Sequence, residues 1–110
     1  MTAPLTAPFT VCRLDDLTAG SARRVEIDGH RLAVIRFDDD AVYVIGDRCS
    51  HADYSLADGE LDQDAGTIEC WKHGSTFSVT TGQPTCLPAT RPVPIYEVSI
   101  VDGEVKVVLP

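Results

Sequence analysis

Two short motifs, each with one cysteine and one histidine, constrain this chain more than any other feature. Cys49-Ser50-His51 is the first, and Cys70-Trp71-Lys72-His73 follows after residues 52–69. Thiolates and imidazoles are transition-metal ligands in proteins. Together the motifs supply two sulfur and two nitrogen ligands. This set suits either tetrahedral zinc or a two-iron cluster with thiolates on one iron and histidines on the other.

The spacing within the motifs indicates where these ligands lie. In both motifs the cysteine and the histidine are closer in sequence than the i, i+4 pair that one helix face presents. We therefore expect two loops that converge at one end of a sheet. Structural zinc sites more usually pair cysteine with cysteine and histidine with histidine. One of each per motif favours the iron cluster, with zinc as the alternative.

The second motif continues as Cys70-Trp71-Lys72-His73-Gly74-Ser75-Thr76-Phe77. With Cys49-Ser50-His51 it resembles the cluster-binding motifs of Rieske [2Fe–2S] proteins. The resemblance implies one [2Fe–2S] cluster per chain, with Cys49 and Cys70 on an inner iron and His51 and His73 on an outer iron near the surface. It also implies the Rieske fold, an antiparallel β-sandwich base with a smaller inserted cluster-binding subdomain.

The residue pattern outside the motifs independently predicts an all-β fold. Alternating and β-branched runs recur between turn signals, and Asp28-Gly29 and Asp102-Gly103 are dipeptides typical of tight hairpins. We predict a helical turn within residues 15–22, ended by Gly20. Strands are predicted over residues 23–27, 31–37, 41–45, 67–70, 76–79, 95–101 and 104–109.

The chain length and the N-terminus bear on its organisation. We expect one domain over residues 1–110, because 110 residues form only a modest core that a metal site would support. Residues 47–88 contain fewer apolar residues and both motifs, so they are the predicted cluster-binding subdomain, with a glycine-rich linker near Gly59 and Gly66. Residues 1–10 have neither a basic start nor an apolar run. We expect a soluble, cytoplasmic monomer without a membrane anchor.

The formal net charge of −8 makes nucleic acid an improbable partner. The acids concentrate around the two motifs, where Arg48 is the only cation within residues 47–69. They could form a solvated face, or they could steer the protein toward a basic docking patch on a redox partner. The clustered acidic residues are Asp47, Asp53, Asp58, Glu60, Asp62, Asp64 and Glu69.

The resemblance also makes the reduction potential predictable. Tyr54 and Lys72 occupy the positions of the disulfide found in high-potential Rieske proteins, and Phe77 replaces a tyrosine that donates toward a cysteine sulfur. Only Ser75 matches, as a hydroxyl donor toward a bridging sulfide. We therefore predict a potential at the low end of the Rieske range, about −150 mV, that stays nearly flat across neutral pH.

Three further residues receive simpler interpretations. We predict that Cys12 and Cys86 are reduced, buried thiols, since disulfides are rare in the cytosol. Cys86 could also line the cluster pocket, because the family places a third loop near it. His30, after the Asp28-Gly29 turn, is predicted to be an exposed hairpin residue.

Function follows from what the chain contains and lacks. A ring-hydroxylating oxygenase needs two more histidines and a carboxylate for its catalytic iron, and only His30 remains. A Rossmann fingerprint is also absent. We therefore expect an electron-transfer component, not an enzyme. The resemblance to soluble Rieske ferredoxins implies that it carries single electrons from a flavin reductase to a terminal oxygenase. The alternatives are a Rieske protein of another pathway, such as iron–sulfur cluster assembly, and an interaction module with a structural metal.

Overall fold

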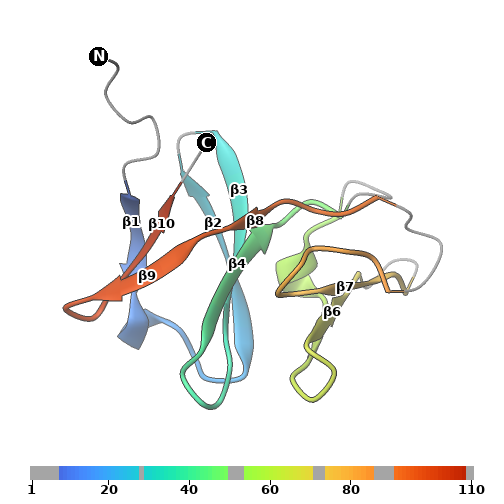
Figure 1. Cartoon of the computed structure of the whole chain (residues 1–110), viewed down its shortest axis with the longest axis horizontal. Helices are drawn as coiled ribbons and strands as arrows, with labels where there is room; N and C mark the ends of the chain where they lie inside the picture. Colours follow the sequence, from blue (N-terminus) through green and yellow to red (C-terminus); the bar gives the residue numbers. More distant parts are fainter. Residues whose placement is uncertain (1–7, 28, 50–53, 71–73, 86–90, 109–110) are drawn as a thin grey trace.

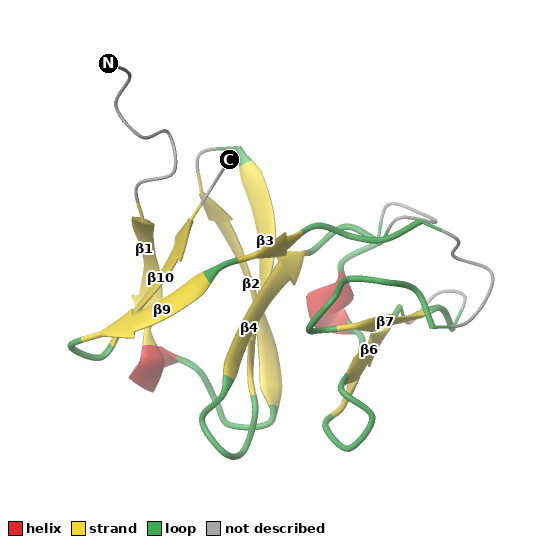
Figure 2. Ribbon diagram, in the orientation of Figure 1, coloured by secondary structure: helices red, strands yellow, loops and turns green. Residues whose placement is uncertain are grey.

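The computed structural model describes residues 8–27, 29–49, 54–70, 74–85 and 91–108. These residues form β-strands and two single-turn 3₁₀ helices, so the all-β prediction is confirmed (Figures 1 and 2). In chain order the elements are β1 (Pro8–Arg13), η1 (Leu14–Asp16), β2 (Ser21–Ile27), β3 (His30–Arg36), β4 (Val42–Gly46), η2 (Leu56–Asp58), β5 (Glu60–Asp62), β6 (Thr67–Glu69), β7 (Thr76–Ser78), β8 (Ile95–Tyr96), β9 (Val98–Val101) and β10 (Glu104–Val108).

The described strands make three antiparallel sheets. One has the order β1-β10-β9, the second β2-β3-β4-β8, and the small third sheet β5-β6-β7. We call the first two sheets the base. Figure 1 shows the small sheet beside the base, on the side of the second sheet away from β1 and β10. The four-stranded sheet thus lies between two other layers.

Strand β3 explains why the layers can stack this way. Leu32, Ala33, Val34 and Ile35 are all fully buried, so this strand has no solvated face. Because successive side chains in a strand point to opposite faces, the run contributes to two cores. Leu32 and Val34 pack in the core that also contains Val105 of β10. Ala33 and Ile35 pack in the core that contains Cys49, Leu56, Ile68, Cys70, Phe77, Val79 and Val93.

Both predicted Asp-Gly hairpins are present. Ile27 pairs with His30 around Gly29, whose φ is 79°. Asp102 and Gly103 have φ values of 52° and 79° between β9 and β10. Two consecutive positive φ angles are those of a type I′ turn, which matches the twist of the strands that it joins.

The predicted strand over residues 95–101 is wrong as a single element. β8 pairs with β4 in the four-stranded sheet, whereas β9 pairs with β10 in the three-stranded sheet. The strand is interrupted at Glu97, whose carbonyl accepts a hydrogen bond from the Val108 amide at 3.1 Å. A strand that passes between two stacked sheets has to leave one ladder before it joins the other.

Three shorter predictions also need correction. Residues 58–66 are not only a linker, because β5 lies within them. The helical turn expected in residues 15–22 is η1, which begins at Leu14 and ends before Gly20, while β2 begins at Ser21. His30 is half-buried, and its ring packs edge-on against Tyr96 with 6.2 Å between ring centroids, so it is not a freely exposed residue.

Candidate metal centre

Cys49 begins a loop whose two ends are paired. Its amide donates to the Tyr54 carbonyl at 2.9 Å, and Arg48 and Ser55 form an isolated antiparallel bridge. The Leu56 amide donates to the Asp47 carbonyl at 2.6 Å. The segments on both sides of residues 50–53 therefore form a short ladder. Cys49 sits at its end with 2% of its surface exposed.

Cys70 begins a second loop that is closed in the same way. Its amide donates to the Ser75 carbonyl at 2.6 Å, and its carbonyl accepts from the Gly74 amide at 3.0 Å. Gly74 has a φ of 77°, a conformation that favours glycine, and it brings the chain back toward β7. In both loops the cysteine amide pairs with the carbonyl five positions later. The described ends of the two loops therefore share one backbone pairing.

Both cysteine side chains lie in one buried apolar cluster, with Leu56, Ile68 and Phe77 among its members. Neither forms a disulfide, so two thiols are available in the same water-poor region. Two thiolates of this kind fit the sulfur half of a Rieske site, and a dry apolar surround suits a cluster that must be kept from water. The donor set that the structure describes thus fits the iron cluster predicted from the sequence.

Several predicted site residues lie outside the described part of the chain: His51, His73, Asp53, Lys72 and Cys86. Among the described residues, no three histidine, cysteine or acidic side chains gather as a metal site. The histidine half of the predicted ligand set therefore stays a prediction. The cysteine half is brought together by the fold.

A surface pocket of about 380 Å³ opens beside Cys49. Its described lining combines two arginines with a short apolar, proline-rich segment from the chain that returns to β8. The sequence predicted Arg48 near the site. It did not predict Arg91, which is distant in the sequence from both cysteine motifs. The lining residues are Arg48, Cys49, Arg91, Pro92, Val93 and Pro94.

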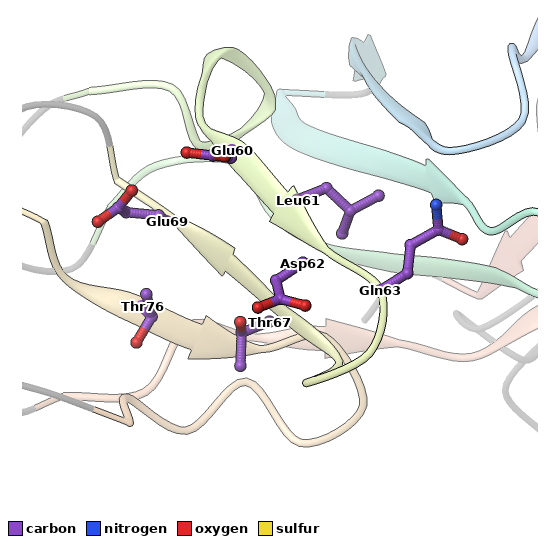
Figure 3. Close-up of a pocket in the computed structure, with 7 residues that line it drawn as sticks. All are labelled: Glu60, Leu61, Asp62, Gln63, Thr67, Glu69 and Thr76. Atoms are coloured by element: carbon purple, nitrogen blue, oxygen red, sulfur yellow. The ribbon is translucent and has the colours of Figure 1, made fainter.

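The small sheet has one acidic face and one apolar face. Figure 3 shows Glu60, Asp62 and Glu69 on one side of the sheet, while Leu61 points to the other. Glu60 lies directly opposite Glu69 in the β5–β6 register. We call Glu60, Asp62 and Glu69 the acidic face. It borders a groove of about 390 Å³ that Thr67 and Thr76 also line.

Asp47 does not belong to this solvated surface, contrary to the prediction from its sequence neighbourhood. Its carboxylate is fully buried. It accepts hydrogen bonds from Ser55 and from the Ala57 amide, and it forms an ion pair with Arg31. A carboxylate is almost never buried without such partners. The sequence carried one signal for this role, the position of Asp47 directly after a buried strand.

Three of the residues predicted to tune the potential are described, and Lys72 lies outside the described part of the chain. Phe77 is fully buried in β7 and belongs to the same cluster as both cysteines. Ser75 is also fully buried and follows the second loop. Tyr54 is half-buried and packs against the apolar core that contains both cysteines. Cys12 lies apart, half-buried in β1 among residues of the other core.

No helix in the described residues is long and apolar enough to cross a bilayer.

Known sequences resemble this chain over most of its length. Residues 7–97 match the Rieske [2Fe-2S] domain family. Ferredoxin CarAc of Metapseudomonas resinovorans is 42% identical over 98 residues, which cover 88% of this chain and 89% of that protein. The 3-phenylpropionate/cinnamic acid dioxygenase ferredoxin subunit of Photorhabdus laumondii is 37% identical over 97 residues, covering 88% and 90% of the two chains.

Solved structures give the same result for the fold. The ferredoxin of carbazole 1,9a-dioxygenase from Nocardioides aromaticivorans IC177 aligns with a TM-score of 0.87 and 37% identity, covering 93% of this chain and 97% of that one. A chain from the complex of reduced oxygenase and oxidized ferredoxin in carbazole 1,9a-dioxygenase aligns with a TM-score of 0.81 and 40% identity, covering 90% and 99%. With two buried cysteines on an all-β base, the chain belongs to the Rieske [2Fe-2S] domain family, and its cofactor is one [2Fe–2S] cluster.

Proposed function

We propose that the protein is a soluble, cytoplasmic one-electron carrier that accepts electrons from a flavin reductase and delivers them to a terminal oxygenase. The observation that carries the proposal is the pair of buried thiols, each on a cysteine whose amide pairs with the carbonyl five positions later. The relatives named as dioxygenase ferredoxin subunits support an oxygenase as the partner. The chain acts as an electron-transfer component and not as an enzyme.

In this proposal Cys49 and Cys70 hold one iron as thiolates, and His51 and His73 hold the other. The cluster, when bound, supplies reversible one-electron chemistry. The chain keeps water from the thiolate side with Leu56, Ile68 and Phe77, which are all fully buried. Residues 47–88 act as the cluster-binding subdomain of a single domain that spans residues 1–110.

The docking surface in this proposal includes the acidic face. Like charges directly opposite each other destabilise a sheet, and Glu60 and Glu69 form such a pair. A sheet that keeps this arrangement gives up some stability for a strongly negative surface. Such a surface steers a partner that carries a basic patch and raises the association rate at low salt.

Analysis of the purified protein tests the cofactor. We expect stoichiometric iron and acid-labile sulfide, and a rhombic EPR signal after reversible one-electron reduction. A colourless, redox-silent zinc protein would support the interaction module instead. If the neighbouring genes encoded iron–sulfur cluster assembly proteins and no oxygenase, a role in cluster assembly would be favoured instead.

Stopped-flow electron transfer to the oxygenase tests the docking surface. We expect the second-order rate constant to fall as ionic strength rises. Glu60→Gln should weaken this salt dependence, whereas Glu97→Gln, which removes one exposed carboxylate from the base, should leave it nearly unchanged. A rate constant that does not change between low and high salt would identify the acidic face as merely solvated. The carrier role would stand.

A further inference from the structure

Asp47 is the most unusual buried residue near the proposed cluster. Its side chain has no exposed surface, and the only other buried polar residues in the described part of the chain are Ser55 and Ser75. Burying a carboxylate is costly unless hydrogen bonds and an opposite charge compensate for the lost water. The contacts of Asp47 therefore indicate which segments its buried carboxylate holds together.

One carboxylate oxygen joins the two sides of the Cys49 loop. Oδ1 accepts a hydrogen bond from Ser55 Oγ at 2.8 Å and another from the Ala57 amide at 2.9 Å. Both donors follow residues 50–53, whereas Asp47 precedes Cys49. The carboxylate thus closes the loop across its base, next to the backbone ladder.

The backbone of Asp47 adds two more bonds at the same point. Its amide donates to the Arg31 carbonyl at 3.0 Å, and its carbonyl accepts from the Leu56 amide at 2.6 Å. Hydrogen bonds of this one residue therefore connect the start of the loop to strand β3 and to helix η2.

The second carboxylate oxygen is incompletely satisfied. Oδ2 receives no hydrogen bond from the described residues and lies 3.5 Å from Arg31 Nη2. That distance permits an ion pair but exceeds a good hydrogen bond. The Arg31 side chain is one-third exposed, so water weakens its charge. Arg31 thus offsets the negative charge of Asp47 only in part, and the Asp47 Cα lies at most about 7.6 Å from that of Cys49.

A neutral amide could accept the same two hydrogen bonds at Oδ1, so loop closure alone does not need a carboxylate. Negative charge near an iron–sulfur cluster stabilises the oxidised form over the reduced one, because reduction adds an electron to a site that already faces an anion. The buried and poorly screened charge of Asp47 is placed for this second effect.

We propose that Asp47 is a positioning residue that holds together the two ends of the Cys49 loop and lowers the cluster's reduction potential. The inference rests on the proposed function, since it assumes that Cys49 binds the cluster. Two substitutions separate its two parts. Asp47→Ala removes both the acceptors and the charge, while Asp47→Asn removes the charge and keeps an acceptor for Ser55 and Ala57.

The loop part is measured as the half-life of the visible cluster absorption in the presence of an iron chelator. We expect Asp47→Ala to shorten the half-life by about tenfold or more, because two hydrogen bonds to a charged group are lost. Asp58→Asn is the matched control, since Asp58 is exposed in η2 of the same loop region. It should keep the wild-type half-life. An Asp47→Ala half-life equal to that of the control would overturn the loop part.

The charge part is measured by protein-film voltammetry. The midpoint potential of Asp47→Asn should rise more than that of Asp58→Asn, although both substitutions remove one negative charge. A purely structural role would not move the potential of a variant that still holds its cluster. Equal shifts in the two variants would refute the charge part.

Two further measurements test the proposal if a variant does not fold or the protein binds no cluster. If Asp47→Ala fails to fold, Ser55→Ala removes one donor and leaves the carboxylate; it should still shorten the half-life, and a wild-type half-life would count against loop closure. If the wild-type protein binds no cluster, the proposed function fails first. The alkylation rate of Cys49 in the metal-free protein then decides the loop part, with Asp47→Ala expected to react faster than Asp58→Asn.

Discussion

The base and the cluster-binding region are stabilised in different ways. The buried residues of the core shared by the two base sheets are all apolar, among them Leu32, Val34 and Val105. The three buried polar residues of the described chain, Asp47, Ser55 and Ser75, all lie in the cluster-binding region. Apolar packing tolerates many sequences, whereas a buried polar network requires each partner in place. The cluster-binding region is thus the more narrowly specified part.

Two glycines of the cluster-binding region differ from the glycines of the base, because backbone atoms lie within 3.0 Å of where their Cβ would be. A Cβ at Gly29, in a base hairpin, would meet nothing within 4 Å. A Cβ at Gly59 would lie 1.6 Å from the Glu69 carbonyl oxygen, and one at Gly82 would lie 2.1 Å from the Val93 carbonyl oxygen. Backbones in the cluster-binding region approach each other where only glycine fits.

The largest expected effect comes from removing a cluster ligand. Cys49→Ser or Cys70→Ser should abolish stoichiometric iron and sulfide, because metal binding and folding are linked. Hydrogen exchange should then accelerate in β5, β6 and β7 far more than in β2 and β10. Cys12→Ser, in the base, should keep the cluster. Equal acceleration in all three sheets would break the contrast between the two regions.

Gly59→Ala should have the next largest effect. The added methyl group would overlap the Glu69 carbonyl, and we expect a loss of unfolding free energy on the order of 4 kcal/mol. Gly66→Ala is the matched control, since its φ is 69° but no atom lies within 4 Å of a Cβ there. Its cost should be about 1 to 2 kcal/mol. Denaturant titrations of the metal-free proteins measure both values, and similar losses would show that the close approach is not needed.

Phe77→Tyr should change function more than stability. The ring is fully buried in the apolar core that contains both cysteines, and the prediction requires that the new hydroxyl reaches a cysteine sulfur. A donor to a thiolate stabilises the reduced cluster, and the midpoint potential should rise from a wild-type value of about −150 mV. Phe37→Tyr, in the turn after β3, is the control. A wild-type midpoint well above zero would refute the low-potential assignment.

The smallest expected effect concerns alkaline pH and lies in the base. Burial raises the pKa of the Cys12 thiol above 9.0, with the nearby Arg23 opposing the shift and Asp16 adding to it, and burial raises the pKa of Tyr96 above 10.0. Both groups keep their protons longer when folded, so their contribution is complete below these values and is lost as pH rises through the folded pKa. Cys12→Ala should flatten the fall in unfolding free energy above pH 9. An unchanged slope would mean that other groups control it.

Local signals in the sequence predicted much of this structure. The Asp-Gly dipeptides fixed both hairpins, because turn chemistry is set by adjacent residues. The cysteines at 49 and 70 were found by motif, and the fold brings them into one core. Even β5 had a readable pattern, Glu60-Leu61-Asp62, in which charged residues alternate with an apolar one.

The remaining features depend on contacts between distant parts of the chain. The break between β8 and β9 follows from which sheet each strand joins, and no local residue signals it. Asp47 looked like one more surface acid, since its partner Arg31 lies on a different strand. Arg91 lines the pocket beside Cys49 although the two residues are far apart in the sequence. The histidine ligands and the potential stay predictions.

Strand β3 has a consequence for protein engineering. Since Ala33 and Ile35 complete the core around the cysteines, residues 47–85 are not a self-contained cassette. A transplant of only the two cysteine loops into another scaffold would lack the apolar side chains of β3 that share their core. The smallest transplantable electron-carrying unit has to include β3, β4 and the returning segment at Val93, so its boundaries follow the sheet and not the motifs.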